Sequence, residues 1–276
     1  MNAPQPGSQP IGVFDSGVGG LSILKALQLQ LPGESFVYLA DSGNAPYGER
    51  DDAFVIQRSR ACLAHLKQHH HIKALVVACN TATALAIHVL REENHELPVF
   101  GVEPAIKPAA AESLTHKVGV LATAATLQSG KFQELLHSLG TTDTAFVLQA
   151  CDGLADAIEN QWQLGHANEV RTLCEKYLRA MGPFGHAPGQ IDTLVLGCTH
   201  YPFASRELQS LTGHAVRLLE PGAPVARRVH QVLQDQGLLA SKVSQPGLLL
   251  LATGETGNLQ QAVWHWLGLR QPALKI

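Results

Sequence analysis

Short apolar runs recur along the chain, and helix-length segments with a longer period separate them. The runs that we expect to form strands are 11–15, 35–40, 73–79, 98–102, 118–122, 145–150, 192–198, 215–220 and 247–253. Segments such as "LSILKALQLQL" (21–31) and "ATALAIHVLREEN" (82–94) lie between them and are typical of helices. The strands lack strict alternation of apolar and polar residues, which indicates that helices cover both faces of a parallel sheet. The pattern therefore predicts an α/β fold.

Two weak internal matches suggest that the chain contains a duplicated unit. "IGVFDSG" (11–17) matches "VGVLATA" (118–124), and "ALVVACNTAT" (74–83) matches "TLVLGCTHYP" (193–202) with a cysteine aligned in each. The alternative is chance, since buried parallel strands resemble one another. A duplication would give two similar α/β units, each with a thiol at the carboxyl end of a strand, where such folds bind ligands. The two thiols could then face each other across a cleft.

The aligned cysteines, Cys79 and Cys198, both stand before an expected helix start. Asn80 or Thr81 after the first cysteine and Thr199 after the second are residue types that cap helices. A thiol beside a helix N-terminus feels a partial positive charge, which lowers its pKa towards the reactive range. The chain has five cysteines, an odd number that fits free thiols better than a disulfide framework. For Cys62, Cys151 and Cys174 we expect only a role in apolar packing.

Two facing thiols are compatible with a metal site, a redox pair or proton transfer. Neither cysteine belongs to a CxxC pair, which argues against zinc and gives no resolving cysteine at short spacing. A thiol with an ordinary pKa of about 8.5 is close to the range that suits general acid–base catalysis. One thiolate that removes a proton and one thiol that delivers a proton to the opposite face would invert a carbon centre. That reaction is a racemisation or epimerisation.

Polar residues near other predicted strand ends are further candidates for ligand contacts. "FDSGVGGLS" (14–22) places Asp15 and Ser16 before a glycine-rich bend whose peptide N–H groups could hold an anion. The bend does not complete a dinucleotide-binding pattern, because Ser22 stands at the third glycine position. Asp15 aligns with an alanine in the second half, which favours a role in the site over helix capping.

Two other segments also offer polar groups at this edge. In the loop "DSGNAPYGER" (41–50), Tyr47 and the Gly48 amide could reach a ligand, although a plain connecting loop is the alternative. His200 directly follows the Cys198 turn and could tune or relay protons for that thiol.

Composition and charge restrict the class of protein. Of the 276 residues, 45% are hydrophobic and 16% are charged, as in a compact soluble protein. A net charge of -3 argues against nucleic acid or an anionic membrane as a partner. No apolar stretch approaches the ~20 residues of a membrane span. The start "MNAPQPGSQP" does not resemble a signal peptide, so we expect a cytoplasmic protein. A homodimer is left open.

Six segments together carry a resemblance to a known family. They are "IGVFDSGVGG", "YLADSGNAPYG", "ACNTATA", "GVEPAIKPA", "LGCTHYPF" and "LATGETGNLQQAVWHWLG", in this order over nearly the whole chain after the tail. The chain thereby resembles bacterial glutamate racemases. The resemblance implies that Cys79 and Cys198 are the catalytic pair, that Asp15 and His200 assist them, and that a family glutamate maps loosely onto Glu159. Substrate contacts are implied at Asp15, Ser16, Tyr47, Gly48, Asn80, Thr81, Thr199 and His200.

The resemblance also implies a fold and a reaction. We expect two similar parallel-sheet α/β domains related by a pseudo-twofold axis, 1–102 plus 214–276 and 103–213, with the active site in the cleft between them. The reaction would interconvert L- and D-glutamate without cofactor or metal and supply D-glutamate for peptidoglycan. The alternatives are an aspartate or hydantoin racemase of the same superfamily and a two-domain amino-acid-binding protein without catalysis.

Overall fold

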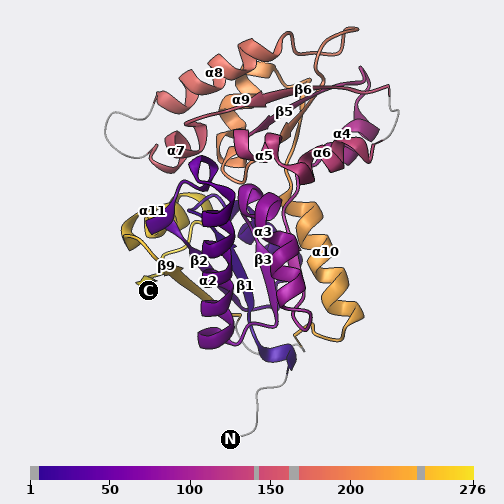
Figure 1. The fold of residues 1–276 in the computed structure, drawn as a ribbon. Coiled ribbons are helices and arrows are strands. Elements are labelled where there is room, and N and C mark those ends of the chain that lie inside the picture. Colours follow the sequence, from indigo (N-terminus) through magenta and orange to yellow (C-terminus); the bar gives the residue numbers. More distant parts are fainter. Residues whose placement is uncertain (1–5, 140–142, 162–167, 241–245) are drawn as a thin grey trace, which may run out of the picture. The chain divides into compact units, whose positions relative to one another are not determined.

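The computed structural model describes residues 6–139, 143–161, 168–240 and 246–276 and divides the chain into two compact units (Figure 1). Unit 1 consists of Met1–Val102 and Gly222–Ile276, and unit 2 consists of Glu103–Pro221. The chain returns to unit 1 at Gly222, later than residue 214 in the expected domain bounds. The difference arises because β8 (Arg217–Leu219) pairs with β7 (Thr193–Leu196) and so extends the sheet of unit 2.

Unit 1 contains a six-stranded parallel sheet in the order β10-β9-β2-β1-β3-β4. Its strands are β1 (Ile11–Asp15), β2 (Phe36–Ala40), β3 (Ala74–Val77), β4 (Val99–Gly101), β9 (Leu248–Ala252) and β10 (Ala273–Lys275). Its helices are η1 (Pro6–Ser8), α1 (Leu21–Gln30), η2 (Ser42–Asn44), η3 (Tyr47–Glu49), α2 (Asp52–His70), α3 (Asn80–Glu93), α10 (Gly222–Asp235) and α11 (Thr256–Leu267). In Figure 1, α2 and α3 lie side by side in front of the sheet. Helix α1 packs against α10 and α11. Every residue of β1, β2 and β3 is buried, as the lack of alternation predicts.

Unit 2 contains a four-stranded parallel sheet in the order β6-β5-β7-β8. Besides β7 and β8, its strands are β5 (Lys117–Ala122) and β6 (Ala145–Ala150). Its helices are α4 (Ile106–Glu112), α5 (Ala124–Gln128), α6 (Gly130–His137), α7 (Leu154–Glu159), α8 (Glu169–Met181), η4 (Tyr201–Ala204) and α9 (Ser205–Thr212). The apolar core on one face of this sheet combines Val118, Val120 and Val195 with residues of α4 and α6.

The same strand order occurs in both units. The order β2-β1-β3-β4 in unit 1 corresponds to β6-β5-β7-β8 in unit 2, so β1 matches β5 and β3 matches β7. These are the two strand pairs that the internal sequence matches align, which favours duplication over chance. All nine predicted strands are confirmed within a few residues. The strand that the sequence did not predict is β10, a three-residue edge strand that is mostly exposed and therefore lacks an apolar run.

A buried ion pair lies at the amino end of the sheet in unit 1. Lys73, directly before β3, lies with its Nζ 2.5 Å from Oε2 of Glu34, and both side chains are almost fully buried. Lys73 Nζ also donates to the Gly7 carbonyl at 2.9 Å, and the Ala240 N–H donates to Glu34 Oε1 at 2.8 Å. The contacts of this ion pair thus connect four segments that are distant in the sequence, around Gly7, Glu34, Lys73 and Ala240, at one end of the sheet. Removal of one partner leaves the other charge buried without compensation.

We predict that Lys73→Met lowers the free energy of unfolding by about 3–5 kcal/mol, since Glu34 then keeps a buried charge without its cation. The double variant Lys73→Met/Glu34→Leu should recover most of this loss, because it removes both charges. Equilibrium denaturation in urea measures the three proteins. A single variant as stable as the parent would contradict the assigned role of the pair.

Candidate active site

The register of neighbouring parallel strands places each aligned cysteine beside the end of the first strand of its unit. Phe14 pairs with Val77 between β1 and β3, and Leu121 pairs with Leu196 between β5 and β7. Beyond these pairs the ladders continue equivalently: Ala78 N–H donates to Phe14 O and Gly197 N–H donates to Leu121 O, both at 2.7 Å. The next residue is the cysteine in each case. Each unit therefore presents a thiol at the carboxyl edge of its sheet.

The Cys79 thiol is buried at an apolar cluster, yet two polar groups contact its sulfur. The Ser16 Oγ lies 3.5 Å from Cys79 Sγ, within hydrogen-bonding distance. The Ala82 N–H at the start of α3 donates to the same sulfur at 3.4 Å. This contact makes Cys79 itself the N-cap of α3, so the expected cap on Asn80 or Thr81 is wrong. The sulfur thus occupies the positive end of a helix, which favours its thiolate form.

Asp15 and the glycine-rich bend fit closely against the strand ends. The Asp15 side chain is fully buried, and its Oδ1 accepts a hydrogen bond from the Gly17 N–H at 2.7 Å. A Cβ atom at Gly20 would lie 2.7 Å from Asp15 Cβ and 3.0 Å from Ala78 Cβ. Only glycine allows this approach, which keeps Asp15 next to the strand that leads into Cys79. Asp15 therefore lies at the same strand ends as Cys79, and Ser16 reaches the Cys79 sulfur.

Asn80 and Thr81 form the first turn of α3 and are both buried. The Asn80 Nδ2 donates to the Val102 carbonyl at 3.3 Å, whereas its Oδ1 is buried and accepts no hydrogen bond from the residues that the structure describes. A buried acceptor without a donor is costly, so this oxygen is suited to a polar ligand. Thr81 lies next to it on the same helical turn.

The structure places Tyr47 close to this group but directs its hydroxyl inwards. Tyr47 is only 1% exposed, and its ring packs 6.2 Å from that of Phe14 and 6.4 Å from that of Phe54, measured between centroids. Its hydroxyl donates to Asp41 Oδ2 at 2.5 Å. Gly48 follows in η3 and is half-buried. A contact of Tyr47 and Gly48 with a ligand stays a prediction, and the buried hydroxyl leaves the main chain as the part that could make it.

In unit 2, Cys198 lies in a chain of titratable groups. Its Sγ is 3.7 Å from His200 Nδ1, and His200 Nε2 is 2.9 Å from Glu159 Oε2. The thiol and the imidazole are both buried. Glu159 comes from the end of α7, so the structure brings it to His200 although the sequence relates them only loosely. The three side chains form a line from carboxylate to imidazole to thiol.

Burial alone would lower the pKa of His200, since it disfavours the charged imidazole. Hydrogen bonds to Cys198 and Glu159 outweigh that effect and hold the pKa of His200 well above its ordinary value. The protonated ring donates through both nitrogens, one towards Glu159 and one towards Cys198. Unit 2 therefore presents the Cys198 sulfur beside a cationic hydrogen-bond donor.

The turn after Cys198 differs from the one after Cys79. A 3₁₀ helix, η4, follows with His200 at its N-cap position and without a side-chain cap, so the expected cap on Thr199 is wrong. Pro202 fits the first turn of η4, as its fixed backbone angle and missing N–H predict. Thr199 is buried directly beside Cys198 in the chain. The expected α-helix begins only at Ser205.

Thr123 is a polar residue at this edge that the sequence reasoning did not single out. Thr123 directly follows β5, just as Ser16 directly follows β1. The strand register places Thr123 next to the position of Cys198. Its Oγ1 accepts from the Thr126 N–H at 3.2 Å and donates to Thr126 Oγ1 at 2.9 Å. The internal match of 11–17 with 118–124 aligns Thr123 with Ser16 and could have identified it.

The other three cysteines fit the packing role expected for them. Cys62, Cys151 and Cys174 are buried free thiols. Burial raises the pKa of Cys174 to about 12 and raises the pKa values of Cys62 and Cys151 further above the ordinary range. These thiols are therefore neutral and unreactive at neutral pH.

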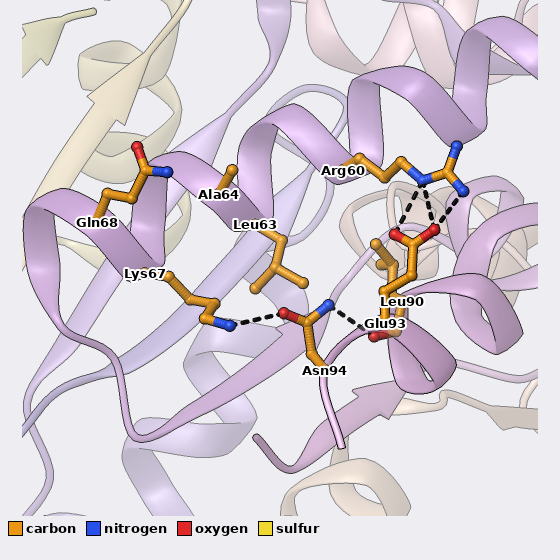
Figure 2. A pocket seen from close by; sticks show the side chains of 8 residues that line it. All are labelled: Arg60, Leu63, Ala64, Lys67, Gln68, Leu90, Glu93 and Asn94. Carbon is orange, nitrogen blue, oxygen red and sulfur yellow. Dashed lines mark hydrogen bonds and ion pairs between the residues drawn. The ribbon is translucent and has the colours of Figure 1, made fainter. Parts of the chain in front are cut away.

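A pocket of about 300 Å³ lies on unit 1 between α2 and α3, away from these residues (Figure 2). Its lining consists of Arg60, Leu63, Ala64, Lys67, Gln68, Leu90, Glu93 and Asn94. Figure 2 shows its polar groups turned towards one another: Arg60 pairs with Glu93, and Lys67 Nζ donates to Asn94 Oδ1 at 2.8 Å. None of the predicted site residues lines this pocket. The pocket arises where α2 and α3 pack against each other near the C-terminal end of α3. Asn80 lies at the other end of this helix.

The described residues offer neither a metal-binding cluster nor a helix that could span a membrane. Within the described ranges, no group of three or more His, Cys, Asp or Glu side chains is arranged to hold a metal ion. In the same part of the chain, no helix has both the length and the apolarity needed to cross a membrane.

Comparison with known proteins identifies the family. A model of the Asp/Glu/hydantoin racemase family matches residues 11–229. The chain is 45% identical to a glutamate racemase of Ectopseudomonas mendocina over 236 residues, which cover 86% of each protein. The chain therefore belongs to the Asp/Glu/hydantoin racemase family.

Solved structures with the same fold agree with this assignment. A glutamate racemase isoform from Bacillus anthracis superposes with a TM-score of 0.85 at 33% identity and 97% coverage of both chains. Escherichia coli glutamate racemase, solved with L-glutamate and an activator, gives a TM-score of 0.81 at 29% identity with the same coverage. These structures have the two-domain fold, so the α/β fold with two parallel sheets is confirmed.

We predict that Glu159→Gln lowers the pKa of His200, because the imidazolium loses its anionic partner. The raised pKa of His200 contributes stability that is fully present below the ordinary imidazole value of about 6.5 and is lost as the pH rises through the folded value. The stability difference between parent and variant should therefore be largest near pH 6 and shrink at alkaline pH. NMR titration of the histidine ring protons measures the pKa directly, with the other histidines as internal controls. An unchanged titration midpoint for His200 would show that Glu159 does not hold its proton.

Proposed function

We propose that the chain is a glutamate racemase that interconverts L- and D-glutamate by two-base proton transfer between Cys79 and Cys198. One observation carries the proposal: equivalent strands of two similar units each end in a buried thiol beside polar partners. The relatives named above are glutamate racemases, which favours glutamate over aspartate or a hydantoin as the substrate. Thiols with such surroundings also argue against an amino-acid-binding protein without catalysis.

The reaction needs one thiolate and one thiol. The thiolate removes the α-proton, and the electron pair of the broken C–H bond stays on Cα and delocalises into the α-carboxylate. The thiol of the other cysteine then delivers its proton to the opposite face, so the configuration inverts and the protonation states of the two sulfurs exchange. The reverse reaction uses the same groups with their roles interchanged. We propose that one cysteine serves each face of Cα.

His200 and Glu159 would assist Cys198. The imidazolium next to Sγ would stabilise the thiolate that forms when Cys198 delivers its proton to Cα, and Glu159 keeps the ring charged and oriented. Glu159 acts through His200 and is a positioning residue in this scheme.

Asp15 and Ser16 would assist Cys79. Ser16 reaches the sulfur directly, and the α3 N-terminus supplies further positive potential. We propose that the buried Asn80 Oδ1 accepts a hydrogen bond from the α-ammonium group of the substrate, which would satisfy this acceptor. Hydrogen-bond donors would have to stabilise the charge that develops on the α-carboxylate. We assign that role to the hydroxyls of Thr81 and Thr199 and to the peptide N–H groups of Tyr47 and Gly48.

The proposal also includes a cellular role and an assembly. A racemase of this kind supplies D-glutamate for peptidoglycan, so we propose a bacterial cytoplasmic location for the protein. Its partner in the reaction is a small-molecule substrate, and two copies of the chain would form a homodimer. Size-exclusion chromatography with light scattering tests the homodimer.

We predict that Cys79→Ser and Cys198→Ser each reduce kcat for glutamate racemisation at least about 1,000-fold, since a hydroxyl is far less acidic than a thiol and the loss of one acid–base group costs about this much. Circular dichroism of each glutamate enantiomer follows the reaction. Cys62→Ser and Cys174→Ser are matched controls with buried thiols and should keep the parent kcat wherever they fold.

Two outcomes would contradict the proposal. Racemisation at the parent rate by either Cys79→Ser or Cys198→Ser would refute the two-thiol scheme. Inert glutamate, with turnover of aspartate or a hydantoin by the parent enzyme, would assign the chain to another activity of its family.

A further inference from the structure

Asp41 is a buried carboxylate at the end of β2 to which the scheme above gives no role. It has no exposed surface, yet its two oxygens accept hydrogen bonds from side chains of three other segments. Arg58 of α2 binds it with two nitrogens, Nε to Oδ2 at 3.0 Å and Nη2 to Oδ1 at 2.8 Å. Thr253, after β9, donates from Oγ1 to Oδ1 at 2.7 Å. Two-point guanidinium–carboxylate contacts of this kind are among the strong hydrogen-bonded ion pairs of proteins.

The remaining donors come from the loop 42–50 itself. Asn44 Nδ2 donates to Oδ1 at 2.9 Å, and the Tyr47 hydroxyl donates to Oδ2 at 2.5 Å. The Asn44 N–H also donates to the Asp41 carbonyl, and the Gly43 N–H donates to Thr253 Oγ1 at 3.1 Å. Since the loop has only two short 3₁₀ turns and no strand pairing, these contacts determine its path.

The far end of the loop lies next to the Cys79 group. Tyr47 belongs to the same apolar cluster as Cys79, and η3 contacts α3, the helix that begins directly after this cysteine. Burial raises the pKa of the Tyr47 hydroxyl, and so does the charge of Asp41, so the hydroxyl stays a donor. Its single proton is committed to Asp41. The side chain of Tyr47 thus fixes the loop, and the peptide groups of Tyr47 and Gly48 are left for a ligand.

We propose that Asp41 is a positioning residue for substrate binding: it holds the loop 42–50 so that the Tyr47 and Gly48 peptide N–H groups meet a substrate carboxylate. This inference rests on the proposed function. Arg58 neutralises the Asp41 charge, so the buried carboxylate does not repel an anionic substrate.

The charge state of Asp41 supports this role. Burial by itself would raise the pKa of Asp41, but the hydrogen bonds from Arg58, Tyr47, Thr253 and Asn44 outweigh it and hold the pKa below its ordinary value. The carboxylate is therefore ionised throughout the neutral range and accepts all five bonds at once.

Asp41→Asn tests the proposal, because an amide of the same shape cannot accept from both Arg58 and the loop donors. We expect KM for both glutamate enantiomers to rise roughly tenfold, the value of one to two lost hydrogen bonds, while kcat changes less than about threefold. A residue that only stabilises the fold would instead lower the active fraction and hence kcat, with KM unchanged. Hydrogen-exchange mass spectrometry of the ligand-free protein should show at least about tenfold faster exchange in 42–50 alone.

Glu34→Gln is the matched control. Glu34 and Asp41 flank the same strand, β2, and each forms a buried ion pair, but Glu34 lies at the amino end with Lys73. We expect this control to lose stability as Asp41→Asn does, with KM and the exchange of 42–50 unchanged. Equal effects of the two variants on KM would overturn the positioning role.

Tyr47→Phe is a milder variant that keeps the ring and removes only the hydroxyl. We expect a rise of KM in the same direction as in Asp41→Asn and smaller than it, because the other contacts of Asp41 persist. A larger rise than in Asp41→Asn would show that the hydroxyl binds the substrate itself, which would overturn the proposal. So would an unchanged KM in both variants.

Failure of the proposed function and failure of the positioning role give different experimental results. If the parent protein does not racemise glutamate, the proposed function fails, and hydrogen exchange then decides alone whether Asp41 orders the loop. If the parent is active and Asp41→Asn loosens the loop without raising KM, the function stands and the positioning role is wrong.

Discussion

The hydrogen-bonded register between the first and third strands of each unit is the constraint on which the candidate site depends. Parallel strands end at a common edge, so residues that follow aligned strands become neighbours whatever their separation along the chain. In unit 1 this brings Ser16 to the Cys79 sulfur. In unit 2 the equivalent register places Cys198 at the corresponding edge, followed by His200. The same backbone arrangement thus produces a buried thiol with polar neighbours twice.

The two thiols have different neighbours, and the difference is chemically informative. Cys79 accepts a hydrogen bond from the first turn of α3 and lies beside a hydroxyl, with Asp15 close to the same strand ends. Cys198 is followed by a 3₁₀ turn and interacts instead with an imidazole that Glu159 keeps protonated. Both sulfurs thus lie next to positive potential from different sources, a helix N-terminus for Cys79 and a nearby cation for Cys198. A reversible reaction between enantiomers requires both sulfurs to act as base and as acid, so each needs its own means of stabilising the anion.

The sequence predicted the features that depend on local pattern. Uninterrupted apolar runs identified nine strands, and the aligned cysteines identified both thiols. It failed where tertiary contacts decide. The N-cap of α3 is Cys79 rather than Asn80. The sequence did not predict this, because cysteine is not a usual capping residue. Glu159 reaches His200 only through the position of α7, and the donors to Asp41 come from positions 44, 47, 58 and 253. No spacing rule relates such partners.

The central claim is that two different thiols act on opposite faces of one carbon. Its most direct test is the racemisation of L-glutamate by the parent enzyme in deuterated water, with mass spectrometry of both enantiomers at early times. A two-base reaction predicts D-glutamate with deuterium at Cα and recovered L-glutamate that still carries its original proton, because the delivering thiol exchanges with solvent. Equal deuterium content in recovered substrate and product from the earliest times would indicate a single base that serves both faces, and it would contradict the account.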